Sequence, residues 1–131
     1  MNRRERDRFD ALLEEVLDSL PPAVHDLLDE APLIVEDHPS AAMMRELGVD
    51  SPEDLCGLHT GIAMTEQSVE HSGVLPTQIH IFREGIIALA GGWRGADADD
   101  RIAEEIRITV LHEVGHHFGL EEDDLDRLGF A

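Results

Sequence analysis

The chain has 131 residues and a formal net charge of −19, from 29 acidic and 10 basic residues. This length suits one domain with its own core, and we expect residues 1–131 to form a single domain. The negative charge repels phosphate backbones, which argues against a nucleic-acid partner. Cys56 is the single cysteine, so an intramolecular disulfide and a zinc site of several thiolates are excluded, and a cytoplasmic setting is favoured.

Apolar residues near the N-terminus recur every three or four positions, as Phe9, Leu13 and Leu20 illustrate. This periodicity predicts an amphipathic helix. No continuous apolar stretch accompanies it, so the segment is interpreted as neither a signal peptide nor a membrane span, and no membrane partner is expected. The two prolines at 21–22 end the helix, and a short second helical turn precedes a predicted strand at 32–36.

The middle of the chain is predicted to supply two further strands. Ser40 caps a brief helix that Gly48 ends. A second strand is expected at 58–64 and a loop at 65–76. Residues 77–82 alternate between apolar and polar types and form the clearest strand of the sequence.

The last third of the chain is dominated by one long predicted helix. A short helix at 86–89 and a glycine-rich connection at 91–95 lead to it, and Gly119 ends it. One last turn or two is expected at 123–129. Three aspartates are candidates for the cap of the long helix: Asp97, Asp99 and Asp100. Its broad apolar face comprises Ile102, Ile106, Val110, Leu111 and Val114.

Helices therefore flank a small sheet of about three short strands. This order predicts an α+β fold, in which a mixed sheet packs against the N-terminal helix and the long C-terminal helix.

The long helix carries the motif His-Glu-x-x-His at residues 112–116. Positions i and i+4 lie on one helix face, so His112 and His116 can bind one metal ion. Glu113 is rotated by about 100° from His112 and can reach a water on the metal rather than the metal itself. This spacing is typical of zinc hydrolases. It predicts His112 and His116 as ligands of zinc (Zn²⁺) and Glu113 as the catalytic base.

A catalytic zinc ion usually has a third protein ligand. Few residues follow His116 in this sequence, so a ligand on a second helix far downstream is not expected. The third ligand is therefore local, comes from upstream or is missing. Gly119 lets the chain reverse after the helix, and the first carboxylates beyond it are Glu121, Glu122, Asp123 and Asp124.

Residues 112–122, His-Glu-Val-Gly-His-His-Phe-Gly-Leu-Glu-Glu, resemble the HExxHxxGxxH/D signature of the metzincins and Asp-zincins. In that signature the third ligand falls ten residues after the first histidine. The resemblance therefore implies Glu122 as the third zinc ligand. Glutamate is one methylene longer than the aspartate often found there, which keeps Glu121 and Asp123 open as substitutes.

The chain as a whole is similar to the small bacterial zincin-like metallopeptidases, also described as minimal zincins. The similarity extends to residues 58–62, 75–82 and 125–130. It implies a zinc-dependent metallopeptidase that hydrolyses peptide bonds in a peptide or protein substrate. It also suggests residues 77–82 as the rim on which an extended peptide pairs as an added strand.

Two departures from the pattern bear on activity. No methionine follows the motif, and the chain contains no tyrosine that would stabilise an oxyanion; Phe130 takes the terminal aromatic position. These departures predict a slow or narrow enzyme.

Two alternative functions stay open. One is a non-catalytic zincin-like binding or regulatory module, and self-association as a homodimer belongs with it. The other is an endoribonuclease-like metal hydrolase, which the charge of −19 and the absence of a third histidine ligand disfavour. The remaining histidines are interpreted as bystanders: His117 packs near the helix, while His59, His71 and His80 are polar surface.

Overall fold

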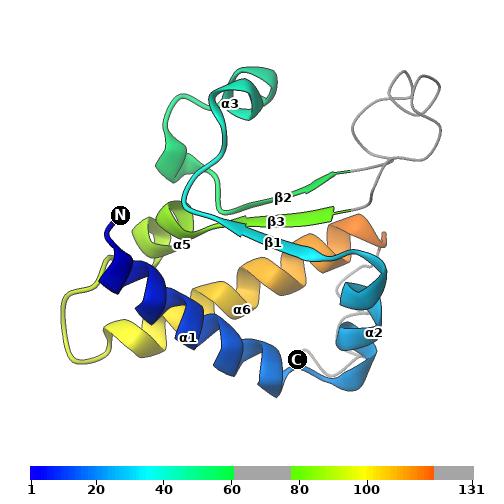
Figure 1. Cartoon of the computed structure of the whole chain (residues 1–131), viewed down its shortest axis with the longest axis horizontal. Coiled ribbons are helices and arrows are strands. Elements are labelled where there is room, and N and C mark those ends of the chain that lie inside the picture. Colours follow the sequence, from blue (N-terminus) through cyan, green and yellow to red (C-terminus); the bar gives the residue numbers. More distant parts are fainter. Residues whose placement is uncertain (61–77, 120–131) are drawn as a thin grey trace.

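Helices and short strands alternate along the part of the chain that the computed structural model describes, residues 1–60 and 78–119. Figure 1 shows α1 and α6 on one side of the sheet and the short helix α3 beyond its other side. The elements are α1 (Arg3–Ser19), α2 (Pro22–Glu30), β1 (Leu33–Glu36), α3 (Ala41–Leu47), the 3-10 turn η1 (Pro52–Asp54), β2 (Gly57–Thr60), β3 (Gln78–Phe82), α5 (Arg83–Ala90) and α6 (Ala98–His117). The predicted α+β fold is confirmed.

Local sequence signals account for where several helices begin and end. Asn2 caps α1 by accepting a hydrogen bond from the backbone N–H of Glu5 at 2.8 Å. Ser40 does the same for α3, and Gly48 ends that helix with a φ of 68°, which a residue with a side chain rarely adopts. The predicted Ser40 cap and Gly48 end of α3 are confirmed. The second helix, α2, has nine residues and is longer than the short turn predicted.

The sheet has the order β1-β3-β2, with β1 parallel and β2 antiparallel to β3. The predicted mixed sheet is therefore correct. Because β3 has a neighbour on each side, its backbone has no free edge for another strand. The interpretation of residues 77–82 as a peptide-binding rim is thus wrong for Gln78–Phe82. Among the described strands, the outer edge of β2 is unpaired, and β2 packs against α6.

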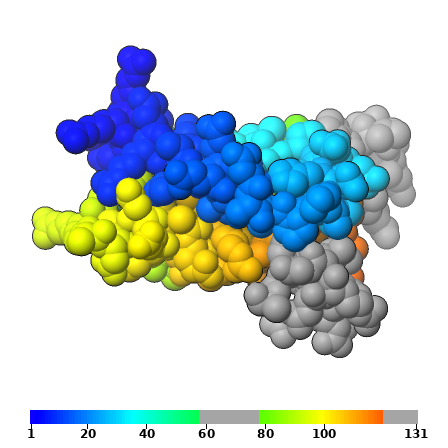
Figure 2. Space-filling view, turned by 90° about the horizontal axis from the view of Figure 1, so that it is seen from below, coloured from blue at the N-terminus to red at the C-terminus, as the bar shows by residue number. Residues whose placement is uncertain are grey.

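The core lies between the sheet and the pair α1 and α6. Figure 2 shows α1 running alongside α6, and the two helices are in contact. Ile79 and Ile81 of β3 are fully buried in the same cluster as Phe9 of α1. Each such side chain contributes about 1.5–3 kcal/mol when it leaves water. On α6, the fully buried residues of this cluster are Ile102, Ile106, Val110 and Val114.

The start of α6 is held by an arginine rather than by an aspartate cap. Asp97 occupies the N-cap position, but its side chain makes no capping hydrogen bond and pairs with Arg101 instead. Arg101 also donates hydrogen bonds to the carbonyl oxygens of Ala90 at 2.9 Å and Arg94 at 2.8 Å. This side chain therefore ties the connection after α5 to the first turns of α6.

The predicted loop at 65–76, most of the predicted strand at 58–64 and the predicted last turns at 123–129 lie outside the described residues. Within residues 1–60 and 78–119, no helix is long and apolar enough to cross a membrane.

Candidate metal centre

The two histidines of the motif lie side by side on the exposed face of α6. Both side chains are exposed, whereas Val114 and Gly115 between them are buried on the opposite face. The ring centroids of His112 and His116 are 4.2 Å apart, with 44° between the ring planes. The helix thus brings together two imidazoles, which are the nitrogen donors that zinc commonly takes in proteins.

The position of His116 in the last turn of α6 favours a cation. His116 and His117 fall in the last turn of the helix. The unpaired carbonyl groups there give the helix end a partial negative charge, which stabilises positive charge nearby. The donor type and the helix position both fit a divalent metal ion.

Glu113 takes a different direction from the two imidazoles and lies between α6 and the sheet. Its side chain is half-buried. An ideal Cβ atom on Gly57 of β2 would lie 2.7 Å from Cγ and 3.2 Å from Cδ of Glu113. The carboxylate-bearing side chain therefore fills the space beside a residue that has no side chain of its own.

Cys56, next to Gly57, lies within the electrostatic reach of the same glutamate. Burial raises the pKa of the Cys56 thiol, and the negative charges of Glu105 and Glu113 raise it further. A thiol with a raised pKa stays protonated at neutral pH, which makes it a poor metal ligand and a poor nucleophile. Cys56 is half-buried, so its environment suits a packed, protonated thiol.

The predicted third ligand, Glu122, lies outside the described residues, as do its substitutes Glu121 and Asp123. Within residues 1–60 and 78–119, no group of three or more histidine, cysteine, aspartate and glutamate side chains could hold a metal ion. The described chain thus supplies two imidazoles of the predicted ligand set, and the carboxylate ligand stays a prediction.

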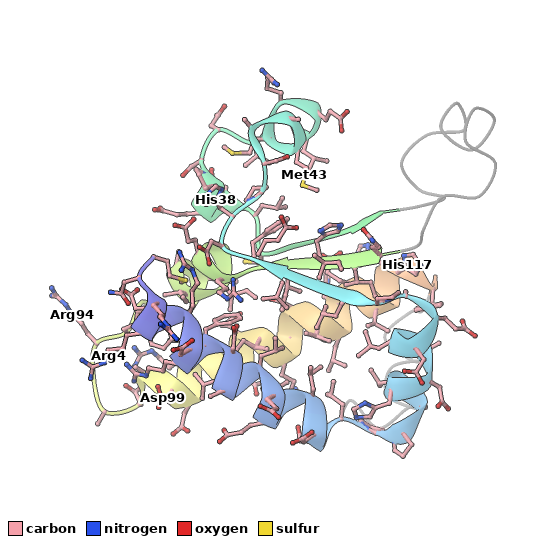
Figure 3. The ribbon with its side chains drawn as sticks, viewed as in Figure 1. Arg4, His38, Met43, Arg94, Asp99 and His117 are labelled. Atoms are coloured by element: carbon pink, nitrogen blue, oxygen red, sulfur yellow. The ribbon has the colours of Figure 1, made fainter. Side chains whose placement is uncertain are left out.

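The ring of His117 packs against Phe118 and does not join the pair formed by His112 and His116. Its ring packs edge-on against that of Phe118, with 4.8 Å between the centroids. Figure 3 shows His117 at the end of α6, close to the sheet. The residue is half-buried. The expectation that His117 packs near the helix agrees with this contact.

His80 of β3 is the histidine that sequence reasoning placed wrongly. Its side chain is 6% exposed, so it is not polar surface. Nδ1 lies 2.9 Å from Oε1 of Glu36 on β1, and the ring stacks on that of Phe82 at 6.3 Å between centroids. The side chain of His59 is not among those described, and His71 lies outside the described residues.

Sequence reasoning also missed Gly57, whose role depends on a neighbour 56 positions away on α6. The available signal was a glycine directly before the predicted strand at 58–64, which is the first residue of β2 in the structure, because a glycine in a strand often marks the close approach of another group.

A helix that presents a His-Glu-x-x-His motif beside a small mixed sheet is typical of zinc-dependent hydrolases. A family model described as zincin-like metallopeptidase matches residues 28–130. The chain therefore belongs to the zincin-like metallopeptidase family, as its resemblance to the minimal zincins predicted. The match begins inside α2, so α1 precedes it. A comparison with curated proteins found no match.

Proposed function

We propose that this member of the zincin-like metallopeptidase family is a cytoplasmic, zinc-dependent peptidase. The observation that carries the proposal is the adjacent pair of exposed imidazoles on α6, His112 and His116, with Glu113 one position along the same helix. Membership of the family supports the peptidase class. The substrate that we propose is a peptide or a protein segment in an extended conformation.

The metal would be held by His112 and His116 through ring nitrogens and by Glu122 through its carboxylate. When bound, zinc supplies Lewis acidity that polarises a peptide carbonyl and lowers the pKa of water. The exposure of the two imidazoles leaves them accessible to a metal ion and to a substrate.

Glu113 is the proposed general base. It accepts a proton from the water that attacks the peptide carbonyl, and it returns this proton to the leaving amine as the C–N bond breaks. One water molecule is consumed, and the carboxylate is regenerated. No tyrosine is present in the chain to donate a hydrogen bond to the oxyanion, so we expect slow turnover.

The outer edge of β2 is the proposed place for the substrate backbone. No described strand pairs with this edge, and the backbone groups of an edge strand can bind an extended peptide as an added strand. Gly57 of β2 lies against Glu113, so a peptide on this edge would pass close to the general base. This assignment replaces residues 77–82, because β3 is flanked on both sides.

The test is a measurement of bound zinc and of peptide cleavage in the same set of proteins. Elemental analysis of the wild type, Glu113→Gln and His116→Ala is combined with a peptide library, with and without a chelator. We expect stoichiometric zinc in the wild type and in Glu113→Gln, and cleavage in the wild type alone. General-base removal should lower the rate by about 10²–10⁴-fold.

His25→Ala is the matched control, because it removes an exposed imidazole from α2 rather than from α6. It should keep both zinc and activity.

Zinc retention by His116→Ala would contradict the metal assignment. Zinc without cleavage in the wild type would favour a non-catalytic binding module, and cleavage of RNA instead of peptides would favour the ribonuclease alternative. Comparison of Glu122→Ala with Asp123→Ala identifies the third ligand.

A further inference from the structure

Gly57 faces the helix that carries the proposed general base. It pairs with Ile81 of β3 in the antiparallel register, and directly opposed residues of an antiparallel pair project their side chains to the same face. Ile81 is fully buried in the cluster that includes α6. A side chain at position 57 would therefore point at α6, where Glu113 lies.

The space that such a side chain needs is already taken by Glu113. An ideal Cβ at position 57 would come within 2.7 Å of Cγ and 3.2 Å of Cδ of this residue. The first distance is far below normal van der Waals contact between carbon atoms. Helical side chains lean towards the N-terminus of their helix, so this contact involves the middle of the Glu113 side chain as it runs back along α6.

The start of β2 is held in place by other contacts. An ideal Cβ on Gly85 of α5 would lie 2.1 Å from the carbonyl oxygen of Leu55, so the backbone before β2 rests directly on α5. The carbonyl oxygen of Cys56 accepts a hydrogen bond from the N–H of Phe82 at 2.8 Å. Because the segment that enters β2 is held by α5 and by β3, added bulk at Gly57 has to be accommodated mainly by Glu113.

We propose that Gly57 is a positioning residue, whose lack of a side chain sets the orientation of Glu113 relative to the two imidazoles. The inference rests on the proposed function, in which Glu113 is the general base. A methyl group at position 57 turns the Glu113 side chain away from β2. The imidazoles of His112 and His116 stay in place, because they are exposed on another part of the helix surface.

The test is Gly57→Ala, measured for zinc content, for kcat and KM on a substrate taken from the peptide library, and by crystallography. We expect full zinc content, a KM within about twofold of the wild type and a kcat lowered by about 10–100-fold, since a misplacement near 1 Å costs on this order. The crystal structure should show Glu113 in a different side-chain conformation over an unchanged β2.

Two further variants separate positioning from a general packing defect. In the Glu113→Gln background, Gly57→Ala should change the residual rate of peptide cleavage by less than about twofold. The proposed effect of Gly57 acts through the Glu113 carboxylate, which this background lacks. Gly85→Ala is the control for damage to the fold. It meets the backbone of Leu55 and should lower the melting temperature, whereas Gly57→Ala should not.

An unmoved Glu113 in the crystal structure of Gly57→Ala, or an unchanged kcat, overturns the inference. The inference is also overturned if Gly57→Ala lowers kcat by the same factor in the wild type and in Glu113→Gln. If Gly57→Ala fails to fold, adding Glu113→Ala restores folding when Glu113 is the obstacle. Failure of that rescue overturns the inference, because the obstacle is then the carbonyl oxygen of His80, 3.1 Å from the ideal Cβ.

Failure of the proposed function gives a different result. If the wild type cleaves no peptide, or if Glu113→Gln cleaves as fast as the wild type, the peptidase assignment falls. The conformation of Glu113 in the Gly57→Ala crystal structure still decides whether the glycine orients this side chain.

Discussion

The two ends of α6 use polar side chains in opposite ways. Figure 3 shows Arg4, Arg94 and Asp99 at the end where α1 and α6 begin, and His117 at the end where α6 finishes. At the first end, which we call the arginine end, Arg8 of α1 contacts Asp99 of α6 at 2.5 Å, and Arg101 binds backbone carbonyl groups. At the other end, the histidine end, the side chains of His112 and His116 are exposed.

This difference is the one expected if α6 serves both as a support and as the proposed metal site. A site needs donors that a ligand can reach, and these donors need a rigid scaffold beneath them. The fully buried residues of α6 extend from Ala98 to Val114, so the helix is anchored along its length by apolar packing. The arginine end adds polar anchors, and the histidine end keeps its two motif imidazoles exposed.

The largest expected effect separates the two ends directly. His112→Ala should lower zinc affinity by more than about 100-fold, because it removes a proposed ligand itself rather than a group that supports one. The free energy of unfolding of the metal-free protein should change by less than about 0.5 kcal/mol, since the side chain is exposed. Competition with a chromophoric chelator gives the affinity, and urea titration of metal-free protein gives the stability. A large loss of metal-free stability would contradict the division between the two ends.

The converse change is made at the arginine end. Arg101→Ala removes charged hydrogen bonds to the carbonyl groups of Ala90 and Arg94, and should lower the free energy of unfolding by about 2 kcal/mol. Urea titration measures this loss, and zinc affinity should stay at the wild-type value. Arg107→Ala is the matched control on the same helix. Its pair with Glu104, at 3.4 Å, is exposed, so the expected loss is below about 0.5 kcal/mol. Equal losses in the two variants would show that the backbone contacts of Arg101 add nothing.

Sequence periodicity predicted α6, its buried face and the two imidazoles, because these features follow from residues three or four positions apart on one helix. The caps of α3 were equally local. The position of β3 was not predictable in this way, since strand order depends on pairing between distant segments. The burial of His80 was missed for the same reason. Alternation along the strand placed His80 on the face opposite Ile79 and Ile81. Its contact with Glu36 forms only when β1 pairs with β3.

The contact between Gly57 and Glu113 illustrates what a motif leaves out. His-Glu-x-x-His specifies the spacing of three side chains along one helix, and that spacing was sufficient to bring two imidazoles together. The conformation of the glutamate depends on which residue of the sheet lies opposite it. That residue is set by the register of β2 on β3 and by the packing of β2 on α6, which no pattern within the motif encodes.

The smallest expected effect concerns the pH dependence of Asp37, which follows β1 and pairs with Arg6 of α1 and Arg83 of α5. The carboxylate of Asp37 accepts hydrogen bonds from Nε of Arg6 at 2.8 Å and from Nη1 of Arg83 at 2.9 Å. Burial by itself would raise the pKa of Asp37, but the hydrogen bonds and charges of the two arginines outweigh it and hold this pKa below its usual value of 3.8. A lowered pKa in the folded state stabilises the fold above the unfolded value, and this contribution is lost as the pH falls through the folded pKa.

Asp37→Asn should therefore lower the free energy of unfolding by about 1 kcal/mol at neutral pH, the order expected for a paired carboxylate that is partly accessible. The difference from the wild type should shrink once the pH drops below 3.8, because the wild-type carboxylate then takes up its proton and resembles the amide. Urea titrations between neutral pH and about pH 2 measure this convergence. Asp26→Asn, an exposed change on α2, is the control and should show no such pH dependence. A stability difference between Asp37→Asn and the wild type that stays constant down to the lowest pH would mean that Asp37 contributes through packing rather than through its charge.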